Sequence, residues 1–500
     1  MDGSDPKERR EGFGVSYRNT GTITSTRNRW VPSSLALLIV VFVLNAITCQ
    51  VLQLLNEPIA ERVQKCSIKS IHQNLSFLDN AHAVTSQEFI LRRDNLAKAL
   101  LTSRVDAFIL EPGYTFQYYG NISQSDWEPW EPEERPFLMI VEPMHNTTTG
   151  EIKAKTSFLS PKFEEGRVRM LGIPSEEELS IVTWEEHWNP YETLRTELFG
   201  NKNSVTVIVD EEIRDFLVRG LSTNGFNTVV LGEEVEAVRQ VKSPAEIELL
   251  RAVNTGTVEA LRAVRNCLVA GLTENEVMTI LDNTLLSVGF SLFFNLVLFE
   301  ENAALPHGGF VTGDKILKED TMILIDVGAH YLGYSSDICR SFFMPQNQRC
   351  CHSWLGPFER LNLFWRTLST VATLQNSTLH EEKLKVWDLV KNAQSESSKK
   401  FTPNHTAADI DITARTIIAN AGYGDMKHRV GHGIGIKAHE SPYLHQRNKR
   451  RLRPGMTFTA EPGVYLEGRF GIRHEDVYLV KEHGDAEILS GSPATSPYDP

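Results

Sequence analysis

The stretch ILIDVGAHYLGYSSDICRSFF, residues 323–343, decides the fold of the second half of the chain. Its apolar start leads to Asp326, which we expect at the end of a buried strand, and a Gly-Tyr turn follows. Asp337 comes after this turn, on a strand that can return antiparallel to the first. A hairpin of this length can bring both carboxylates to one face, where one chelates a metal ion and the other bridges two.

Three later stretches supply further groups of the ligand type: HRVGHGIGIKAHESPYL (428–444), TFTAEPGVYL (457–466) and GIRHEDVYLV (471–480). His432 lies in a glycine-rich run, where the backbone can approach a ligand closely. Glu461 precedes a Pro-Gly turn, and strand alternation places Arg473 and Glu475 on one face. Taken alone, each residue is more often an ordinary turn or strand-end residue. Their joint occurrence in these contexts favours a shared site.

The five candidate ligands carry the charge that two adjacent divalent ions require. They are Asp326, Asp337, His432, Glu461 and Glu475. Two cations about 3.5–4 Å apart repel each other, and bridging carboxylates with a bridging hydroxide offset that repulsion. Oxygen ligands with a single imidazole favour Mn²⁺, with Co²⁺ or Zn²⁺ as alternatives. The sequence therefore predicts a hydrolytic centre with two divalent metal ions.

The N-terminus predicts a membrane attachment. Residues 1–33 have no apolar periodicity and are interpreted as a disordered cytosolic tail. Leu35–Leu44 is an unbroken apolar decamer, so residues 34–55 are interpreted as an uncleaved transmembrane signal-anchor; a cleaved signal peptide and a buried helix are the alternatives. Five glycosylation sequons follow it, at Asn74, Asn121, Asn146, Asn376 and Asn404. We therefore expect a single-pass membrane glycoprotein with a lumenal or extracellular body, or alternatively a secreted protein.

Length, net charge and cysteine content limit the classes of protein to which the chain can belong. The length of 500 residues favours two domains with appendages. A formal net charge of −13 argues against a nucleic-acid-binding surface, which would need a basic face. Six cysteines are too sparse for a disulfide framework, and they leave the redox compartment open.

Local patterns divide the chain into two domains. Residues 85–241 alternate a helical pattern with short apolar runs, which indicates a small α/β domain. A boundary falls near Lys242, because Ser243, Pro244 and Glu246 form the capping box of a new helix. A further helix is expected at 273–289, where Thr273 and Glu276 form a second capping box, and another is expected at 409–422. The passage 346–383 lacks periodicity and is either an insertion or a gene-model artefact.

Together these motifs resemble the pita-bread metallopeptidases, which include methionine aminopeptidase, Xaa-Pro aminopeptidase and prolidase. The resemblance is specific over 242–345 and 384–485, and 85–240 is more loosely similar to the creatinase-like N-terminal domain of that family. It implies an α/β (α+β) fold, with a creatinase-like domain at 85–241 followed by a pita-bread catalytic domain at 242–490. Dimers are common among similar proteins, so a homodimer is expected.

The resemblance also implies roles for the site residues. Asp326 would chelate the first ion, Asp337 and Glu475 would bridge both ions, and His432 and Glu461 would complete the second. The outer positions of the site are matched by His307, His428, His439 and Arg473. The three histidines would bind the carbonyl and proline region of the substrate and move protons, while Arg473 would lie behind the ligands. His474 departs from the pattern, and would either add a proton donor or face solvent.

Three functions are then open. The leading prediction is a metal-dependent exopeptidase that hydrolyses an N-terminal Xaa-Pro bond through a hydroxide held by two metal ions, acting on peptides with proline at the second position. The second is a prolidase-type dipeptidase restricted to Xaa-Pro dipeptides. The third is a metal-free binding protein on the same fold, which the presence of all five ligands disfavours.

Overall fold

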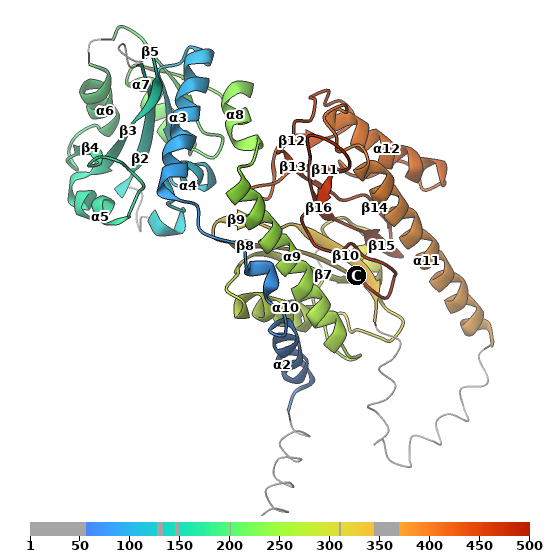
Figure 1. Ribbon diagram of the computed structural model, residues 1–500. Coiled ribbons are helices and arrows are strands. Elements are labelled where there is room, and N and C mark those ends of the chain that lie inside the picture. Colours follow the sequence, from blue (N-terminus) through green and yellow to red (C-terminus); the bar gives the residue numbers. More distant parts are fainter. Residues whose placement is uncertain (1–56, 128–133, 146–149, 201, 310–311, 345–369) are drawn as a thin grey trace, which may run out of the picture. The chain divides into compact units, whose positions relative to one another are not determined.

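The computed structural model describes residues 57–127, 134–145, 150–200, 202–309, 312–344 and 370–500 (Figure 1). A six-stranded mixed sheet, in the order β4-β3-β2-β1-β5-β6, organises the first half. Its strands are β1 (Ala107–Leu110), β2 (Leu138–His145), β3 (Ile152–Pro161), β4 (Ser180–Trp184), β5 (Val205–Val209) and β6 (Phe226–Val229). β1 is apolar and buried throughout because it lies inside the sheet, antiparallel to β2 and parallel to β5.

Helices surround this sheet in the expected α/β manner. They are α3 (Ser86–Ser103), α4 (Tyr114–Gly120), α5 (Glu165–Met170), α6 (Pro190–Phe199), α7 (Asp215–Thr223) and α8 (Glu233–Gln240). α3 begins where Thr85 accepts a hydrogen bond from the Glu88 amide, which satisfies one of the free N–H groups of its first turn. The predicted α/β class is confirmed.

The second half contains two larger sheets and one hairpin. The first sheet has the order β10-β8-β7, with β9 also paired to β8, and the second has the order β12-β11-β13-β16-β17. A separate hairpin joins β14 and β15. The strands are β7 (Ser291–Phe299), β8 (Met322–Tyr331), β9 (Tyr334–Ser335), β10 (Ile338–Phe343), β11 (Gly431–Gly433), β12 (Glu440–Leu444), β13 (Thr457–Ala460), β14 (Gly463–Leu466), β15 (Phe470–Arg473), β16 (Asp476–Leu479) and β17 (Glu487–Ile488).

Two helix pairs belong to these sheets (Figure 1). The first pair is α9 (Pro244–Cys267) and α10 (Glu274–Ser287), and the second is α11 (Thr370–Ser398) and α12 (Ala407–Asn420). The capping boxes predicted at the starts of α9 and α10 are both formed, because side chain and backbone satisfy each other reciprocally. Residues Ile59–Pro500 form one compact unit, so the domain boundary near Lys242 stays a prediction.

The structure corrects two local expectations. Asp326 lies in the middle of β8 and not at its end, since β8 continues to Tyr331. Arg473 and Glu475 do not share a strand, because β15 ends at Arg473 and β16 begins at Asp476 in another sheet. Of the passage 346–383, residues up to 369 lie outside the described part, and its interpretation stays a prediction.

The prediction of a single-pass membrane glycoprotein is wrong. Across the part of the chain that the structure describes, none of the helices combines the length and apolar character that a membrane span requires. The tail at 1–33 and the segment at 34–55 lie outside the described residues. The membrane partner, the single-pass location and the glycoprotein assignment depended on a membrane span, and they are withdrawn with it.

A disulfide ties the start of the compact unit to its interior. Cys66 in α2 (Ile59–Ile71) is bonded to Cys267 at the end of α9, 201 residues later in the sequence. Sequence analysis did not find this pair, because its two cysteines have no local motif in common. Cys339 is a free thiol in the buried part of β10.

Candidate metal centre

Five separate segments bring the predicted ligands into one cavity of about 520 Å³. Asp326 comes from β8, Asp337 precedes β10, and His432 lies in β11. Glu461 directly follows β13, and Glu475 lies between β15 and β16. The cavity therefore lies where the two sheets of the second half and the β14–β15 hairpin meet.

The ligand-type atoms form three overlapping groups, each within 4.8 Å. The groups are Asp326 with Asp337 and Glu475; His432 with Glu461 and Glu475; and Asp337 with His432 and His439. Asp337, Glu475 and His432 thus each belong to two groups, and the first two are carboxylates. His432 Nε2 lies 3.5 Å from Asp337 Oδ2 and 3.4 Å from Glu461 Oε1. This sharing is the arrangement that carboxylates bridging two ions would have.

Backbone contacts fix the direction of the His432 ring. Its amide donates to Thr459 Oγ1 at 3.2 Å, and its Nδ1 lies 3.0 Å from the Gly433 carbonyl, so Nε2 faces the carboxylates. The close approach of β11 to β13 requires glycine at 431, since a Cβ there would lie 2.2 Å from the Thr459 carbonyl oxygen. The glycine-rich run is therefore needed for strand packing beside the ligand.

Burial raises the pKa values of three carboxylates in the cavity. Burial, together with the charge of Asp326, raises the pKa of Asp337 to about 6. Burial, with the charges of Asp337 and Asp326, raises the pKa of Glu461 to about 8 against the opposing charge of Arg473. Burial and its carboxylate neighbours raise the pKa of Glu475 well above its usual range. Without cations the cluster therefore retains protons near neutral pH.

Unsatisfied oxygen atoms show where cations would fit. Among the described residues, Asp326 Oδ1 and Glu475 Oε1 are buried and have no hydrogen-bond partner. An unpaired buried carboxylate oxygen is costly, and a cation would satisfy it. The donor set of carboxylates and one well-oriented imidazole fits divalent metal ions.

Arg473 connects the ligands to the rest of the cavity wall. Its guanidinium is fully buried and pairs with Asp326 Oδ2. It also donates to the Pro306 carbonyl at 2.7 Å and to the Tyr465 hydroxyl at 2.8 Å. Because Arg473 holds one oxygen of Asp326, the other oxygen is left to face the cavity.

The three predicted outer histidines line the same cavity. His428 Nε2 lies 2.8 Å from the Tyr465 hydroxyl, and burial with the charge of Arg473 lowers the His428 pKa to about 4. His439 is half-exposed, and its Nε2 lies 3.4 Å from Asp337 Oδ2. The geometry thus places His439 at ligand distance, closer to the carboxylates than an outer position implies. His307 is exposed at the cavity wall.

Sequence reasoning missed Tyr465, which lies within a quoted motif but has no feature that distinguishes it from a core aromatic. In the structure it bridges Arg473 and His428 through its hydroxyl. Tyr114 and Phe293 were also missed, and both line the cavity from elements outside the motifs.

Comparison with known proteins identifies the class as metallopeptidase. A profile described as "Metallopeptidase family M24" matches residues 248–354 and 366–482. An uncharacterized peptidase of Schizosaccharomyces pombe is 31% identical over 482 residues, covering 95% of this chain and 98% of the relative. The chain belongs to metallopeptidase family M24, which confirms the predicted resemblance. Enzymes of this family generally bind divalent metals, and the groups described above could hold them.

Solved structures confirm the predicted fold. The dipeptidase PepE from Mycobacterium ulcerans matches with a TM-score of 0.65 at 22% identity, covering 82% of this chain and 98% of that one. The X-Pro aminopeptidase from Thermotoga maritima matches with a TM-score of 0.59 at 24% identity, covering 82% and 98%. At these identities the likeness concerns the fold, and it does not separate the two activities.

Proposed function

We propose that the chain is an aminopeptidase that removes the first residue from peptides with proline at the second position, using two divalent metal ions. The observation that carries this proposal is that the carboxylates Asp337 and Glu475 each belong to two groups that could hold an ion. Asp326 would complete one ion site, and His432 with Glu461 would complete the other. When bound, the two ions would supply a hydroxide nucleophile near neutral pH and polarise the scissile carbonyl. Manganese is the proposed native metal, because most of the ligands are carboxylate oxygens.

The surrounding residues would orient the substrate and move protons. His439 is exposed beside Asp337, where it could donate a hydrogen bond to the oxygen that becomes negative during attack. His428 is held by Tyr465 and kept neutral by its surroundings, so it could accept a hydrogen bond or a proton from the substrate. His307 lies in the connection between β7 and β8, and it would contact the substrate from there. Arg473 would position Asp326 and Tyr465 without touching the substrate.

A dipeptidase specific for Xaa-Pro is the alternative, since it would use the same ligands. The discriminating experiment measures hydrolysis of Ala-Pro and of Ala-Pro-Ala by chelator-treated enzyme reconstituted with Mn²⁺, Co²⁺ or Zn²⁺, with Ala-Ala-Ala as the control peptide. Release of alanine from the tripeptide supports the aminopeptidase. Cleavage of the dipeptide alone supports the alternative, and no cleavage of either with any metal rejects both.

The ligand assignment has its own test by metal analysis. We expect His432→Ala and Glu461→Ala to retain fewer than two ions per chain, because each removes a ligand of the second site. His439→Ala should retain both ions but lose activity, since its proposed role is toward the substrate. Loss of metal in His439→Ala would instead make that residue a ligand.

A further inference from the structure

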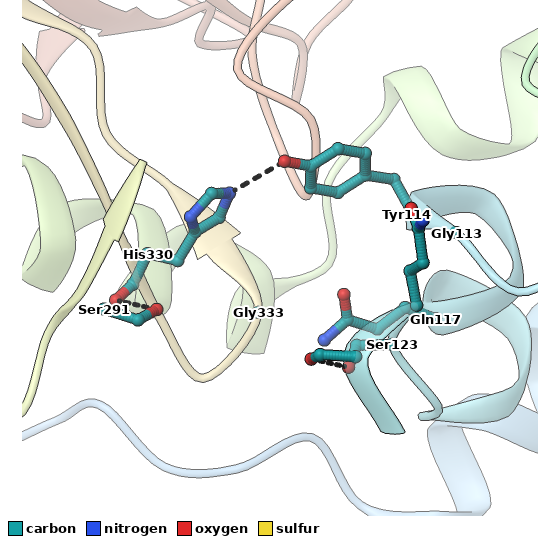
Figure 2. A pocket seen from close by; sticks show the side chains of 9 residues that line it. Gly113, Tyr114, Gln117, Ser123, Ser291, His330 and Gly333 are labelled. Carbon is teal, nitrogen blue, oxygen red and sulfur yellow. Dashed lines mark hydrogen bonds between the residues drawn. The ribbon is translucent and has the colours of Figure 1, made fainter. Parts of the chain in front are cut away.

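The short segment 333–337 delivers Asp337 to the candidate metal centre. It begins in the turn after β8, includes the two residues of β9, and ends where β10 begins. Gly333, its first residue, borders a polar cavity of about 580 Å³ together with Gln117 of the N-terminal half (Figure 2). Gly333 has φ +88°, and a Cβ on it would lie 2.8 Å from Gln117 Nε2. The start of the segment is therefore packed closely against α4.

A buried hydrogen-bond network fixes the next residue, Tyr334, which is only 2% exposed. Its hydroxyl donates to Glu246 Oε1 at 2.9 Å and accepts from Arg92 Nη2 at 2.9 Å. Arg92 lies on α3, while Glu246 belongs to the first turn of α9. The two halves of the chain thus meet at this hydroxyl, and the start of the segment is held without any of the candidate metal ligands.

Asn254 of α9 holds the other end of the segment. Its Oδ1 accepts a hydrogen bond from the Asp337 amide at 3.2 Å, and its Nδ2 donates to the Leu250 carbonyl at 2.8 Å. A longer contact of 3.4 Å joins Nδ2 to the Ser335 carbonyl. One orientation of the fully buried carboxamide serves all three contacts, since its oxygen must face an N–H group and its nitrogen must face carbonyls.

The Asp337 amide depends on this side chain because the sheet does not supply its acceptor. The antiparallel ladder between β10 and β8 begins one residue later, at the pair Ile338–Val327. A buried N–H group without an acceptor is costly, so losing the Asn254 oxygen would favour turning this peptide towards another partner. The carboxylate of Asp337 would then move with its own backbone.

A small movement of this carboxylate would matter for both ions. Ligand distances in a metal site tolerate deviations of only about 0.2 Å. Asp337 belongs to two of the groups that could hold an ion, so its displacement would weaken both. Asn254 is not among the described residues that line the metal cavity, and its amide is neutral. Any effect of Asn254 on metal binding must therefore act through Asp337.

We propose that Asn254 is a positioning residue, which holds the backbone of Asp337 so that its carboxylate can bridge two divalent ions. The inference rests on the proposed two-ion function. It makes Asn254 necessary for metal affinity, whereas an ordinary buried hydrogen bond would contribute to folding stability alone.

The test is calorimetric titration of Mn²⁺ into the chelator-treated and desalted full chain, for wild type, Asn254→Leu, Asn254→Ser and Asn254→Asp. The first two variants lose the acceptor and should bind Mn²⁺ about 10- to 100-fold more weakly, the usual effect of losing a group that orients a metal ligand. Asn254→Asp keeps an oxygen in reach of the Asp337 amide and should restore binding close to wild type. The matched control is Thr284→Val, which removes another fully buried hydrogen bond, from Thr284 Oγ1 to the Ile280 carbonyl in α10, and should keep wild-type affinity.

Urea unfolding in chelator measures the loss of stability separately, and Asn254→Leu and Thr284→Val should lower the midpoint by similar amounts. The inference is overturned if Asn254→Leu and Asn254→Ser both bind Mn²⁺ with wild-type affinity, or if Thr284→Val weakens binding as much as they do. Asn254→Ser, the smaller change, decides the question where Asn254→Leu does not fold. Because the readout is not peptide cleavage, wild type that binds Mn²⁺ but cleaves no peptide rejects the proposed function alone, and wild type that binds no Mn²⁺ rejects both.

Discussion

Several buried polar atoms near the candidate metal centre have no hydrogen-bond partner, and bound metal ions would satisfy only some of them. Asp326 and Glu475 each keep one buried oxygen without a hydrogen-bond partner, and metal ions would satisfy both. His474, the neighbour of Glu475, is fully buried, and neither of its ring nitrogens has a partner among the described residues. The expectation that His474 faces solvent is wrong, because it packs edge-on against Trp387 with ring centroids 4.7 Å apart.

His474→Leu should therefore maintain or raise the stability of the protein. Burial lowers the pKa of His474 well below its usual value, so the buried ring is neutral but unsatisfied. Removing two unpaired polar atoms should add about 1 kcal/mol to the free energy of unfolding, measured by urea titration at pH 7. His483→Leu, at an exposed position, is the control and should change little. A loss of stability in His474→Leu would mean that the imidazole has a hydrogen-bond partner, such as a water molecule.

At the scale of elements, the connection between β11 and β12 carries His439 and is attached to the N-terminal half. Lys437 in this connection pairs with Glu211 at 2.6 Å and with Glu212 at 2.9 Å, both just after β5. The Lys437 side chain is only 14% exposed, and the two carboxylates raise its pKa despite burial. The ion pairs therefore restrict the connection that places His439 beside Asp337.

Lys437→Met should loosen this connection. We expect kcat on Ala-Pro-Ala to fall about three- to tenfold, because small displacements of a catalytic group are costly. The free energy of unfolding should fall by only about 1 kcal/mol, since Glu211 is half-exposed. Lys399→Met is the matched control: its pair with Glu396 also measures 2.6 Å but is exposed at the C-terminal end of α11, with Lys399 just after the helix, so both quantities should stay near wild type. Equal effects in the two variants would contradict a specific role for Lys437.

The success of sequence reasoning at this scale depended on how local the determining contacts are. The starts of α9 and α10 were predicted because a capping box involves residues only three positions apart. The break between β15 and β16 was not predicted, because strand alternation continues through it while the two strands join different sheets. The five candidate ligands were proposed from their motifs, whereas Tyr465 and Tyr114 make contacts with distant segments that no local pattern records.

At the scale of the whole molecule, metal binding and folding should be linked through protons. The pKa of Glu461 is raised to about 8 and that of Glu475 is raised well above its usual range, so the folded metal-free protein holds protons that the unfolded chain has released. Stability should then fall as pH rises. His432 and His428 have lowered pKa values, and their effect has the opposite sign but is complete by about pH 7. The carboxylates therefore dominate above pH 7.

In the presence of a metal chelator, the free energy of unfolding should decrease from pH 7 to pH 9. The decrease is at most about 1.4 kcal/mol per pH unit for each proton that the folded protein binds in excess of the unfolded chain. Saturating Mn²⁺ should remove this decrease, because cations favour the deprotonated carboxylates. Urea titrations at pH 7, 8 and 9 with and without metal measure both slopes. Glu461→Gln should flatten the slope in chelator. A metal-free protein whose stability is constant or rises over this range would contradict the assigned protonation.

The Cys66–Cys267 disulfide acts on the molecule as a whole, because it closes a segment of 201 residues. Cross-linking distant positions restricts the unfolded chain, so breaking the bond should lower the free energy of unfolding by about 2–5 kcal/mol. If the cross-link is the whole effect, then Cys66→Ala, Cys267→Ala and the double variant should be destabilised equally. Cys66 is exposed and Cys267 is buried, so a larger effect of Cys267→Ala alone would assign the stabilisation to packing in α9. Urea titration of the three variants, with reduced wild type as the reference, distinguishes the two explanations.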